Sequence, residues 1–307
     1  MKRRDFVTTA LTLAAAAALP KAANAATNTE EGTTMTTPAN RPASGYAPVN
    51  GVEIYYEIHG SGAPLVLLHG GFGAIEMFGP VLAALAEKRQ VIGVDLQGHG
   101  RTLPFDNRPM TFANMATDVA GLIKWLGYEK VDVMGYSMGG NTATRIAIDH
   151  PEVVNKLVVA SAPFALKGMH DYNLQGMAQI GAAPEQAAEG MKQTPMYPMY
   201  VQLMPDAEKN WPKTVAQTGA LVNTDYDWSA EVKQITAPTM LVFADWDAIR
   251  IAHIATFFEL LGGGLQDAQW DGSGMNKNRL AILPGATHYT TFMDPRLAPT
   301  ALGFLDA

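Results

Sequence analysis

The residues that could most clearly take part in catalysis lie where a short apolar run ends in Gly135-x-Ser137-x-Gly139. The run predicts a buried strand, and residues 141–148 predict a helix that ends before Pro151, since a residue before proline is disfavoured in the α conformation. A serine on such a tight turn needs flanking residues that are nearly free of side chains. Its hydroxyl then stands at the positive end of the helix dipole, where a developing oxyanion is stabilised. We therefore expect Ser137 to be a nucleophile; the alternative is an ordinary turn between a strand and a helix.

A serine hydroxyl needs an adjacent base, and that base needs a carboxylate to orient it. Of the seven histidines, His288 follows the last predicted strand on a Gly-Ala-Thr approach, so we predict it to be the base. Asp245 and Asp247 both follow an earlier predicted strand, and Asp247 lies further into the loop. We therefore favour Asp247 as the acid and a turn-capping role for Asp245. The chain order Ser137, Asp247, His288 is the one expected of this turn.

An oxyanion is stabilised by fixed N–H donors about 3 Å from the developing charge. One donor is expected from Met138, the residue after the nucleophile, and the other from Gly71 or Phe72, in the glycine-rich loop that follows the apolar run 64–68. Gly71 is the first choice. His69 begins this loop and is expected to brace it through hydrogen bonds.

The elements that must position these residues alternate between strands and helices. Residues 46–58 predict a β-hairpin around Asn50-Gly51, and helical spacing of apolar residues follows from Ile75 to Leu85 and from Phe112 to Leu126. Runs that predict strands lie at 64–68, 91–94, 131–134, 156–161, 239–243 and 279–283. This order predicts an α/β fold with a doubly wound, mostly parallel sheet and helices on both faces, whose chemistry lies at the carboxyl ends of the strands.

The alternation stops between residues 164 and 234, where helix-compatible pieces are interrupted by prolines. We expect a helical cap here, inserted into a core made of residues 45–163 and 235–307. Its many methionines and aromatic residues would give a pocket an adaptable apolar lining. The alternative is that they pack the cap onto the core. Residues 262–278 form a glycine-rich insertion with no evident purpose.

The first 25 residues have the pattern of an export signal. A basic start with paired arginines is followed by an apolar stretch over 7–19 and by the small-x-small site Ala23-Asn24-Ala25. The arginine pair resembles a twin-arginine signal. The apolar stretch is shorter than the ~20 residues of a spanning helix, so we expect cleavage near Ala25 and a periplasmic or secreted protein rather than an anchored one. Residues 26–44 are predicted to be a flexible leader.

Composition excludes several classes of function. The chain has no cysteine, which excludes disulfides and cysteine-ligated metals, and no pattern points to another metal site. Its formal net charge is −7, and loss of residues 1–25 removes four basic and one acidic residue to leave −10. Such acidity disfavours nucleic acid and anionic membrane surfaces as partners.

Taken together, these motifs resemble the α/β-hydrolase fold superfamily over roughly residues 45–162 and 236–305. The resemblance implies an eight-stranded sheet and a serine-dependent enzyme without a cofactor. Epoxide hydrolases and haloalkane dehalogenases of this fold have Asp at the nucleophile position, the turn between strand and helix that Ser137 occupies here. Ser137 therefore argues against both activities. The matching motifs are His69-Gly70-Gly71-Phe72-Gly73, Asp95-x-x-Gly98-His99-Gly100, Gly135-Tyr136-Ser137-Met138-Gly139-Gly140, Asp245-x-Asp247 and Gly285-x-x-His288.

The resemblance covers esterases, lactonases, C–C bond hydrolases and perhydrolases alike. We expect a hydrolase that cleaves an ester or lactone of a small to medium apolar substrate through an acyl-enzyme, with no stable membrane insertion. C–C bond hydrolysis or perhydrolysis on the same triad is the alternative. A non-catalytic ligand-binding protein is a third reading, disfavoured because such proteins commonly lose a member of the triad.

Overall fold

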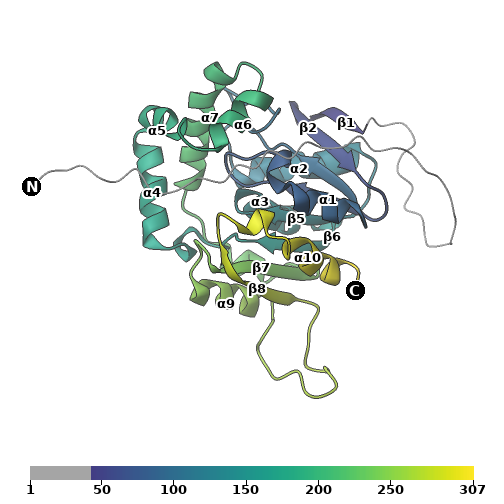
Figure 1. The fold of residues 1–307 in the computed structure, drawn as a ribbon. Helices are drawn as coiled ribbons and strands as arrows, with labels where there is room; N and C mark the ends of the chain where they lie inside the picture. The colour runs from purple at the N-terminus through teal and green to yellow at the C-terminus, as the bar shows by residue number, and fades with distance from the viewer. Residues whose placement is uncertain (1–42) are drawn as a thin grey trace, which may run out of the picture. The chain divides into compact units, whose positions relative to one another are not determined.

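The centre of the protein is one eight-stranded sheet with the strand order β1-β2-β4-β3-β5-β6-β7-β8 (Figure 1). This computed structural model describes residues 43–307. The pairs β1–β2 and β2–β4 are antiparallel and all other pairs are parallel, which confirms the predicted doubly wound, mostly parallel sheet. The strands are β1 Ser44–Val49, β2 Val52–His59, β3 Pro64–Leu68, β4 Gln90–Val94, β5 Val131–Tyr136, β6 Val154–Ala160, β7 Thr239–Trp246 and β8 Arg279–Thr287.

The predicted export signal and most of the predicted leader lie outside the described residues. Ser44, the last residue of that leader, already belongs to β1. Strands β1 and β2 form the predicted hairpin, with Asn50-Gly51 at its turn. Both turn residues have positive φ, 51° and 78°, as a tight hairpin turn requires.

Helices cover both faces of the sheet because strand side chains alternate between two apolar clusters. In β3, Leu65 and Leu67 enter one cluster, while Val66 and Leu68 enter the other. Helices α1 and α10 contribute to the first cluster, and helices α2, α3 and α9 to the second. These helices are α1 Pro80–Ala86, α2 Phe112–Trp125, α3 Met138–Asp149, α9 Ile251–Leu260 and α10 Leu297–Leu305.

The helix expected over Ile75 to Leu85 is in fact two pieces. A 3-10 turn, η1 Ile75–Phe78, precedes α1, and Gly79 between them has φ 42°. Pro80 supplies no N–H and disfavours the α conformation in the residue before it, so a single helix cannot pass this point. The apolar spacing correctly predicted the buried face but not this break.

Residues 164–234 are helical and leave the sheet and return to it at neighbouring points. Leu166 N–H donates to the Tyr226 carbonyl at 3.0 Å, and Trp228 N–H donates to the Phe164 carbonyl at 3.0 Å. We interpret this segment as the predicted cap. Figure 1 shows α4 to α7 grouped together beside the sheet. The helices are α4 Asp171–Ala182, α5 Pro184–Met191, α6 Met196–Leu203, α7 Ala207–Val222 and α8 Ser229–Val232, after the 3-10 turn η3 Leu166–Gly168.

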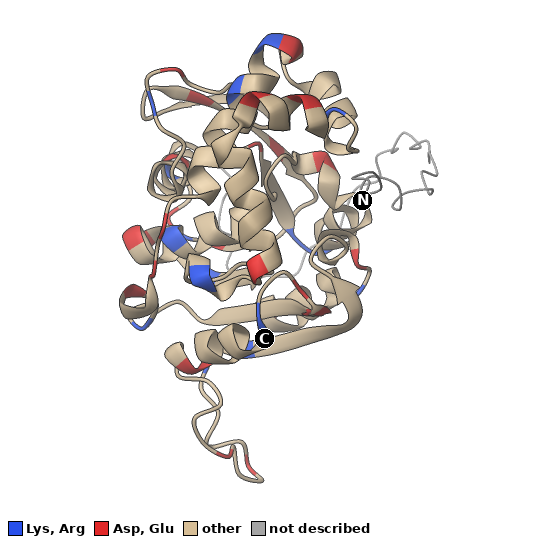
Figure 2. Cartoon of the chain, turned by 90° about the vertical axis from the view of Figure 1, so that its left-hand side faces the viewer, with Lys and Arg blue, Asp and Glu red and all other residues tan. Residues whose placement is uncertain are grey.

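The insertion 262–278, which we call the arm, projects from the body between α9 and β8 in Figures 1 and 2. Near its tip, Gln266 bonds to the Gly274 carbonyl, and at its base the arm bonds to the end of α9, to the Leu261 carbonyl and to Thr239 N–H. Figure 2 also shows basic and acidic residues interspersed over the elements that face the viewer. Among residues 43–307, no helix combines the length and apolar character needed to cross a bilayer.

Short 3-10 turns complete the chain path: η2 Pro151–Val153 follows α3, and η4 Thr291–Met293 precedes α10. Thr111 caps α2, since its side chain accepts a hydrogen bond from Asn114 N–H at 3.0 Å.

Candidate active site

Ser137 occupies the turn between β5 and α3 with a strained backbone, φ 52° and ψ −118°. A non-glycine residue in this region is held there only when its surroundings determine it. A Cβ on Gly135 would lie 2.0 Å from the Gly139 carbonyl oxygen, and one on Gly139 would lie 2.3 Å from the Leu68 carbonyl oxygen. Glycine is therefore required on both sides of Ser137, because β5, α3 and β3 pack backbone to backbone here.

The side chains of Ser137, His288 and Asp247 form a hydrogen-bonded series in the structure. Ser137 Oγ lies 3.1 Å from His288 Nε2, and His288 Nδ1 lies 2.9 Å from Asp247 Oδ1. The Asp247 side chain is fully buried, whereas 12% of the His288 side chain is exposed. The carboxylate holds the Nδ1 proton, so Nε2 is left as the acceptor that faces the serine hydroxyl.

Asp247 is itself held by several donors. Ser161 Oγ donates to Asp247 Oδ2 at 2.6 Å, Ala244 N–H donates to the same oxygen at 3.1 Å, and Ile249 N–H donates to Oδ1 at 3.3 Å. Burial alone raises the pKa of Asp247, but the hydrogen bond and charge of His288, with the Ser161 and Ala244 donors, hold that pKa below its usual value. Asp247 is therefore ionised at neutral pH.

Ser161 was not among the residues predicted for the site. It is the first residue past β6, the strand that lies between the nucleophile strand β5 and the acid strand β7. A polar residue at the carboxyl end of a central parallel strand is a signal that sequence reasoning could have used.

Asp245 serves a different purpose from Asp247. Its Oδ2 accepts a hydrogen bond from Gly285 N–H at 2.9 Å, which ties the end of β7 to the approach to His288. The backbone of His288 is fixed as well, because Tyr136 Oη donates to its carbonyl oxygen at 2.5 Å. Burial raises the pKa of Tyr136 well above its usual value, so this hydroxyl keeps its proton.

The loop 69–75 passes directly beside the nucleophile. A Cβ on Gly70 would lie 3.4 Å from Ser137 Cβ, and one on Gly71 would lie 4.0 Å from Met138 Sδ. Met138 is the first residue of α3, and N–H groups in a first helical turn have no acceptor within the helix. The N–H groups of Met138 and of Gly71 or Phe72 therefore belong to segments that meet at Ser137, and their role as oxyanion donors stays a prediction.

His69 braces this loop as predicted. Its Nδ1 donates to the Gly70 carbonyl at 2.7 Å, and its Nε2 accepts from Leu96 N–H at 3.0 Å. Burial, aided by the nearby His99, lowers the pKa of His69 to about 3, so the ring is neutral and both nitrogens are engaged. We therefore expect His69 to take no part in the proton transfers at Ser137.

Both tryptophans of the cap pack on their neighbours. Trp211 is fully buried, its ring lies 4.9 Å from that of Tyr200 and 5.9 Å from that of Phe72, and its Nε1 donates to the Ala188 carbonyl at 2.8 Å. Trp228 instead packs edge-on against Phe112 of α2, at 5.6 Å between ring centroids. The alternative reading, that such residues pack the cap onto the core, holds for these side chains.

No group of three or more His, Asp or Glu side chains within residues 43–307 is placed to hold a metal ion.

The arrangement can be compared with known proteins. A family model described as alpha/beta hydrolase fold matches residues 63–266. The chain belongs to the α/β-hydrolase fold family. Membership agrees with the sheet order and with the serine turn, and it carries no substrate with it.

Relatives of this α/β hydrolase have several different activities. A soluble epoxide hydrolase from Corynebacterium sp. (strain C12) is 41% identical over 37% of this chain, and that alignment spans 39% of the relative's length. A protein of Azorhizobium caulinodans, provisionally named a carbamate hydrolase, is 26% identical over 73% of this chain and 87% of its own length. A fluoroacetate dehalogenase from a Burkholderia species is 36% identical over 36% of this chain and 38% of its own length.

Solved structures share the fold. A hydrolase from Pseudomonas aeruginosa superimposes with a TM-score of 0.64 at 22% identity, over 87% of this chain and all of its own. A carboxylesterase from Bacillus subtilis gives a TM-score of 0.64 at 21% identity, over 87% of this chain and 92% of its own. These likenesses establish the α/β-hydrolase fold and leave the reaction to be argued from the site.

Proposed function

We propose that this α/β hydrolase is a serine-dependent enzyme that cleaves carboxylic esters or lactones of small to medium apolar substrates through an acyl-enzyme. The observation that carries the proposal is the hydrogen-bonded series from Ser137 Oγ to His288 Nε2 at 3.1 Å and from His288 Nδ1 to Asp247 Oδ1 at 2.9 Å. Nucleophile, base and orienting carboxylate stand in the order that acyl transfer requires.

In the first half-reaction, His288 Nε2 takes the hydroxyl proton while Ser137 Oγ bonds to the acyl carbon. The buried carboxylate of Asp247 stabilises the imidazolium that forms. The carbonyl oxygen becomes an oxyanion, for which we propose the N–H groups of Met138 and Gly71, or Phe72 in place of Gly71, as donors. When the tetrahedral intermediate collapses, the alkoxide leaves with the proton from His288 and the acyl group stays on Ser137.

In the second half-reaction, water takes the place of the alcohol. His288 Nε2 removes a proton from water as its oxygen attacks the acyl carbon, and the same N–H donors hold the second oxyanion. Ser137 Oγ then leaves with the proton from His288, and the carboxylic acid is released. Every proton movement passes through one nitrogen, whose partner nitrogen stays bonded to Asp247.

The identity of the elbow residue favours an acyl substrate over an epoxide or a halide. Ser137 carries a hydroxyl where the α/β hydrolases that open epoxides or displace halide use a carboxylate. A serine ester is hydrolysed by attack at its acyl carbon, which the oxyanion donors can assist. The residues that carry the proposed donors are themselves apolar or glycine, and from this we infer an apolar acyl group.

Ser137→Ala tests the proposal. With a series of p-nitrophenyl esters of increasing acyl length, kcat should fall by about 10⁴–10⁶ while the protein stays folded. The wild-type chain-length profile would report the size of the acyl site. Undiminished ester turnover in Ser137→Ala would refute the assignment. Turnover of a dienoate C–C bond or of peroxide with a carboxylic acid, in the absence of ester turnover, would replace it with the alternative chemistry on the same triad.

We also propose that the enzyme is exported. The support is the sequence pattern of residues 1–25, which lie outside the described residues. Mass spectrometry of the protein isolated from its native host should find a mature N-terminus near Ala26. An intact N-terminus in the isolated protein would argue against export.

A further inference from the structure

Two consecutive residues after β4 hold both ends of the loop 69–75. At its start, Leu96 N–H donates to His69 Nε2 at 3.0 Å. At its end, Ile75 N–H donates to Asp95 Oδ1 at 3.0 Å. The residues proposed as oxyanion donors lie between these two attachment points. The segment 95–96 therefore fixes where the loop enters and leaves the site.

The carboxylate of Asp95 is fully buried and is itself fixed from the other side. Its Oδ2 accepts Arg101 N–H at 2.9 Å and Arg101 Nη1 at 3.0 Å. A Cβ on Gly100 would lie 2.1 Å from Asp95 Cγ, so only glycine leaves room for this contact. The motif Asp95-x-x-Gly98-His99-Gly100 is thus explained in part by the space that the carboxylate needs.

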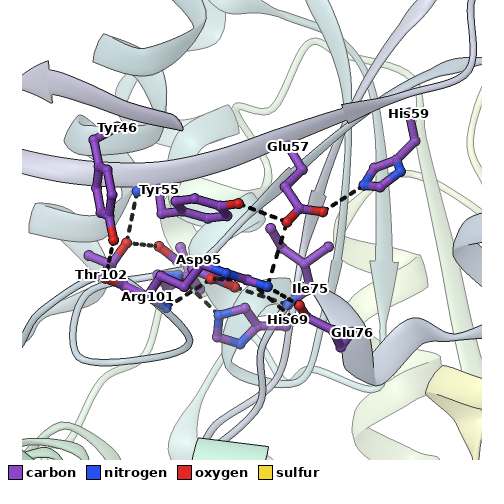
Figure 3. A network of polar contacts seen from close by, with 11 residues as sticks. Tyr46, Tyr55, Glu57, His59, His69, Ile75, Glu76, Asp95, Arg101 and Thr102 are labelled. Carbon is purple, nitrogen blue, oxygen red and sulfur yellow. Dashed lines mark hydrogen bonds and ion pairs between the residues drawn. The ribbon is translucent and has the colours of Figure 1, made fainter. Parts of the chain in front are cut away.

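Arg101 joins this carboxylate to β2 and η1, as Figure 3 shows. Its guanidinium pairs with Glu76 and lies 3.6 Å from Glu57, and it stands 4.5 Å from the centre of the Tyr55 ring. Glu57 in turn accepts from the Tyr55 hydroxyl at 2.9 Å. The cation beside Asp95 therefore has little freedom to move.

Keeping this carboxylate buried has an energetic cost. Burial raises the pKa of Asp95 to about 6, although the N–H groups of Ile75 and Arg101 and the charge of Arg101 act to lower it. A charge that is only partly compensated inside a protein destabilises the fold. Its retention at the loop beside the nucleophile is understandable if the loop must be held in one place.

We propose that Asp95 is a positioning residue that sets the oxyanion donors of the loop 69–75 through its bond to Ile75 N–H. The inference rests on the proposed function, since the place of these N–H groups matters only if an oxyanion forms at Ser137. Asp95 touches no reacting atom. It acts through the backbone of the loop, so its loss affects the transition state more than the bound substrate.

Asp95→Asn tests the proposal, because an amide cannot accept at both Oδ1 and Oδ2. We expect kcat for a p-nitrophenyl ester to fall by about 10- to 100-fold with KM changed by less than about twofold. Affinity for a trifluoromethyl ketone, which forms an oxyanion when Ser137 adds to it, should fall in parallel. A residue with only a structural role would lower stability and leave kcat and this affinity unchanged.

Asp132→Asn is the matched control. Asp132 is also a buried aspartate that pairs with an arginine, Arg89 at 2.6 Å, and accepts a backbone N–H, that of Lys156 at 3.0 Å. It lies near the amino end of β5, whereas Ser137 follows the carboxyl end of the same strand. Asp132→Asn should lower the melting temperature without changing kcat.

Arg101→Gln decides the question if Asp95→Asn fails to fold. Arg101 and Glu76 are the charged groups that face Asp95 most closely, beside the neutral His69, while Glu57 and Tyr55 face it through Arg101. Removing the cation makes Asp95 easier to protonate. The acid limb of the pH profile of kcat should therefore move to higher pH, and kcat should fall several-fold. An unmoved acid limb with unchanged kcat in folded Arg101→Gln would overturn the inference.

For folded Asp95→Asn, a kcat equal to that of Asp132→Asn, or a change confined to KM, would also overturn the proposed positioning role of Asp95. The proposed function is checked separately on the wild-type protein. If the wild type turns over no ester and resists a fluorophosphonate, the function itself fails. If the wild type is active and labelled while the Asp95 variant matches the control, only the positioning role fails.

Discussion

At the scale of single residues, two aspartates at the carboxyl end of β7 have different roles. Asp247 lies 2.9 Å from His288 Nδ1 through its Oδ1, while Asp245 accepts from Gly285 N–H. The sequence places both after a strand predicted over 239–243 and favours Asp247 only by its greater reach, whereas β7 extends to Trp246 and includes Asp245. What distinguishes them physically is the set of donors around Asp247, which includes Ser161 from a strand that is distant in the sequence.

Asp247→Asn should therefore lower kcat by about 10⁴, because an amide favours the wrong tautomer of the histidine. Asp245→Asn keeps an acceptor for Gly285 N–H and should stay within about threefold of the wild type. Steady-state kinetics of the two variants with one ester make the comparison. Equal losses in both would show that Asp247 is not the orienting carboxylate.

The raised pKa of Asp95 predicts how stability depends on pH. Its folded value of about 6 exceeds its ordinary value of 3.8, so the folded chain binds a proton that the unfolded chain releases between these pH values. This contribution to stability is complete below 3.8 and is lost as pH rises through about 6. The melting temperature of the wild type should therefore exceed that of Asp95→Asn by more at pH 5 than at pH 8. A difference that grows with pH instead would contradict the raised pKa.

At the scale of elements, the sequence predicts what its periodicity encodes. The continuous apolar run of β3 and the helical spacing in α2 identified both elements, and the chain order placed the serine, aspartate and histidine loops together at the carboxyl ends of the strands. The break between η1 and α1 was missed because an apolar face can continue across a proline. The packing of the cap was also beyond sequence reasoning, since an aromatic residue gives the same signal in a pocket as in a core.

Trp211 shows how much the cap depends on such packing. It is fully buried among Tyr200, Tyr197 and Phe72, so Trp211→Ala should cost about 3–5 kcal/mol of stability. Trp270 on the arm is fully exposed, and Trp270→Ala should change stability by less than about 0.5 kcal/mol. Denaturant unfolding of both variants tests this. Similar losses in the two would mean that Trp211 does not hold the cap together.

At the scale of the whole molecule, the parts that the comparisons establish are the sheet and its family. The family match spans 63–266, which includes the serine and acid loops and stops short of the histidine loop. Relatives named for epoxide, carbamate and carbon–fluorine chemistry share this scaffold. We therefore expect a few side chains at the strand ends, together with the cap, to decide the reaction.

The side-chain hydrogen bonds of the arm's outer part stay within the arm. Its residues 264–274 bond to one another, whereas Asn276 and Asn278 bond to the Leu261 carbonyl and Asn278 also accepts from Thr239 N–H. Replacing 264–274 by a short glycine linker should leave kcat within about twofold of the wild type and leave the protein folded. Kinetics and a melting curve of the shortened protein measure both. A large loss of activity would assign the arm a role in the site.

The most direct test of the central claim is to label the purified protein with a fluorophosphonate and locate the adduct by mass spectrometry. We predict one adduct, on the peptide that contains Ser137, which is absent in Ser137→Ala and suppressed when an ester substrate is present. An adduct on another residue, or a folded wild-type protein that neither reacts nor turns over any ester, would contradict the assignment of Ser137, His288 and Asp247 as an acyl-transfer site.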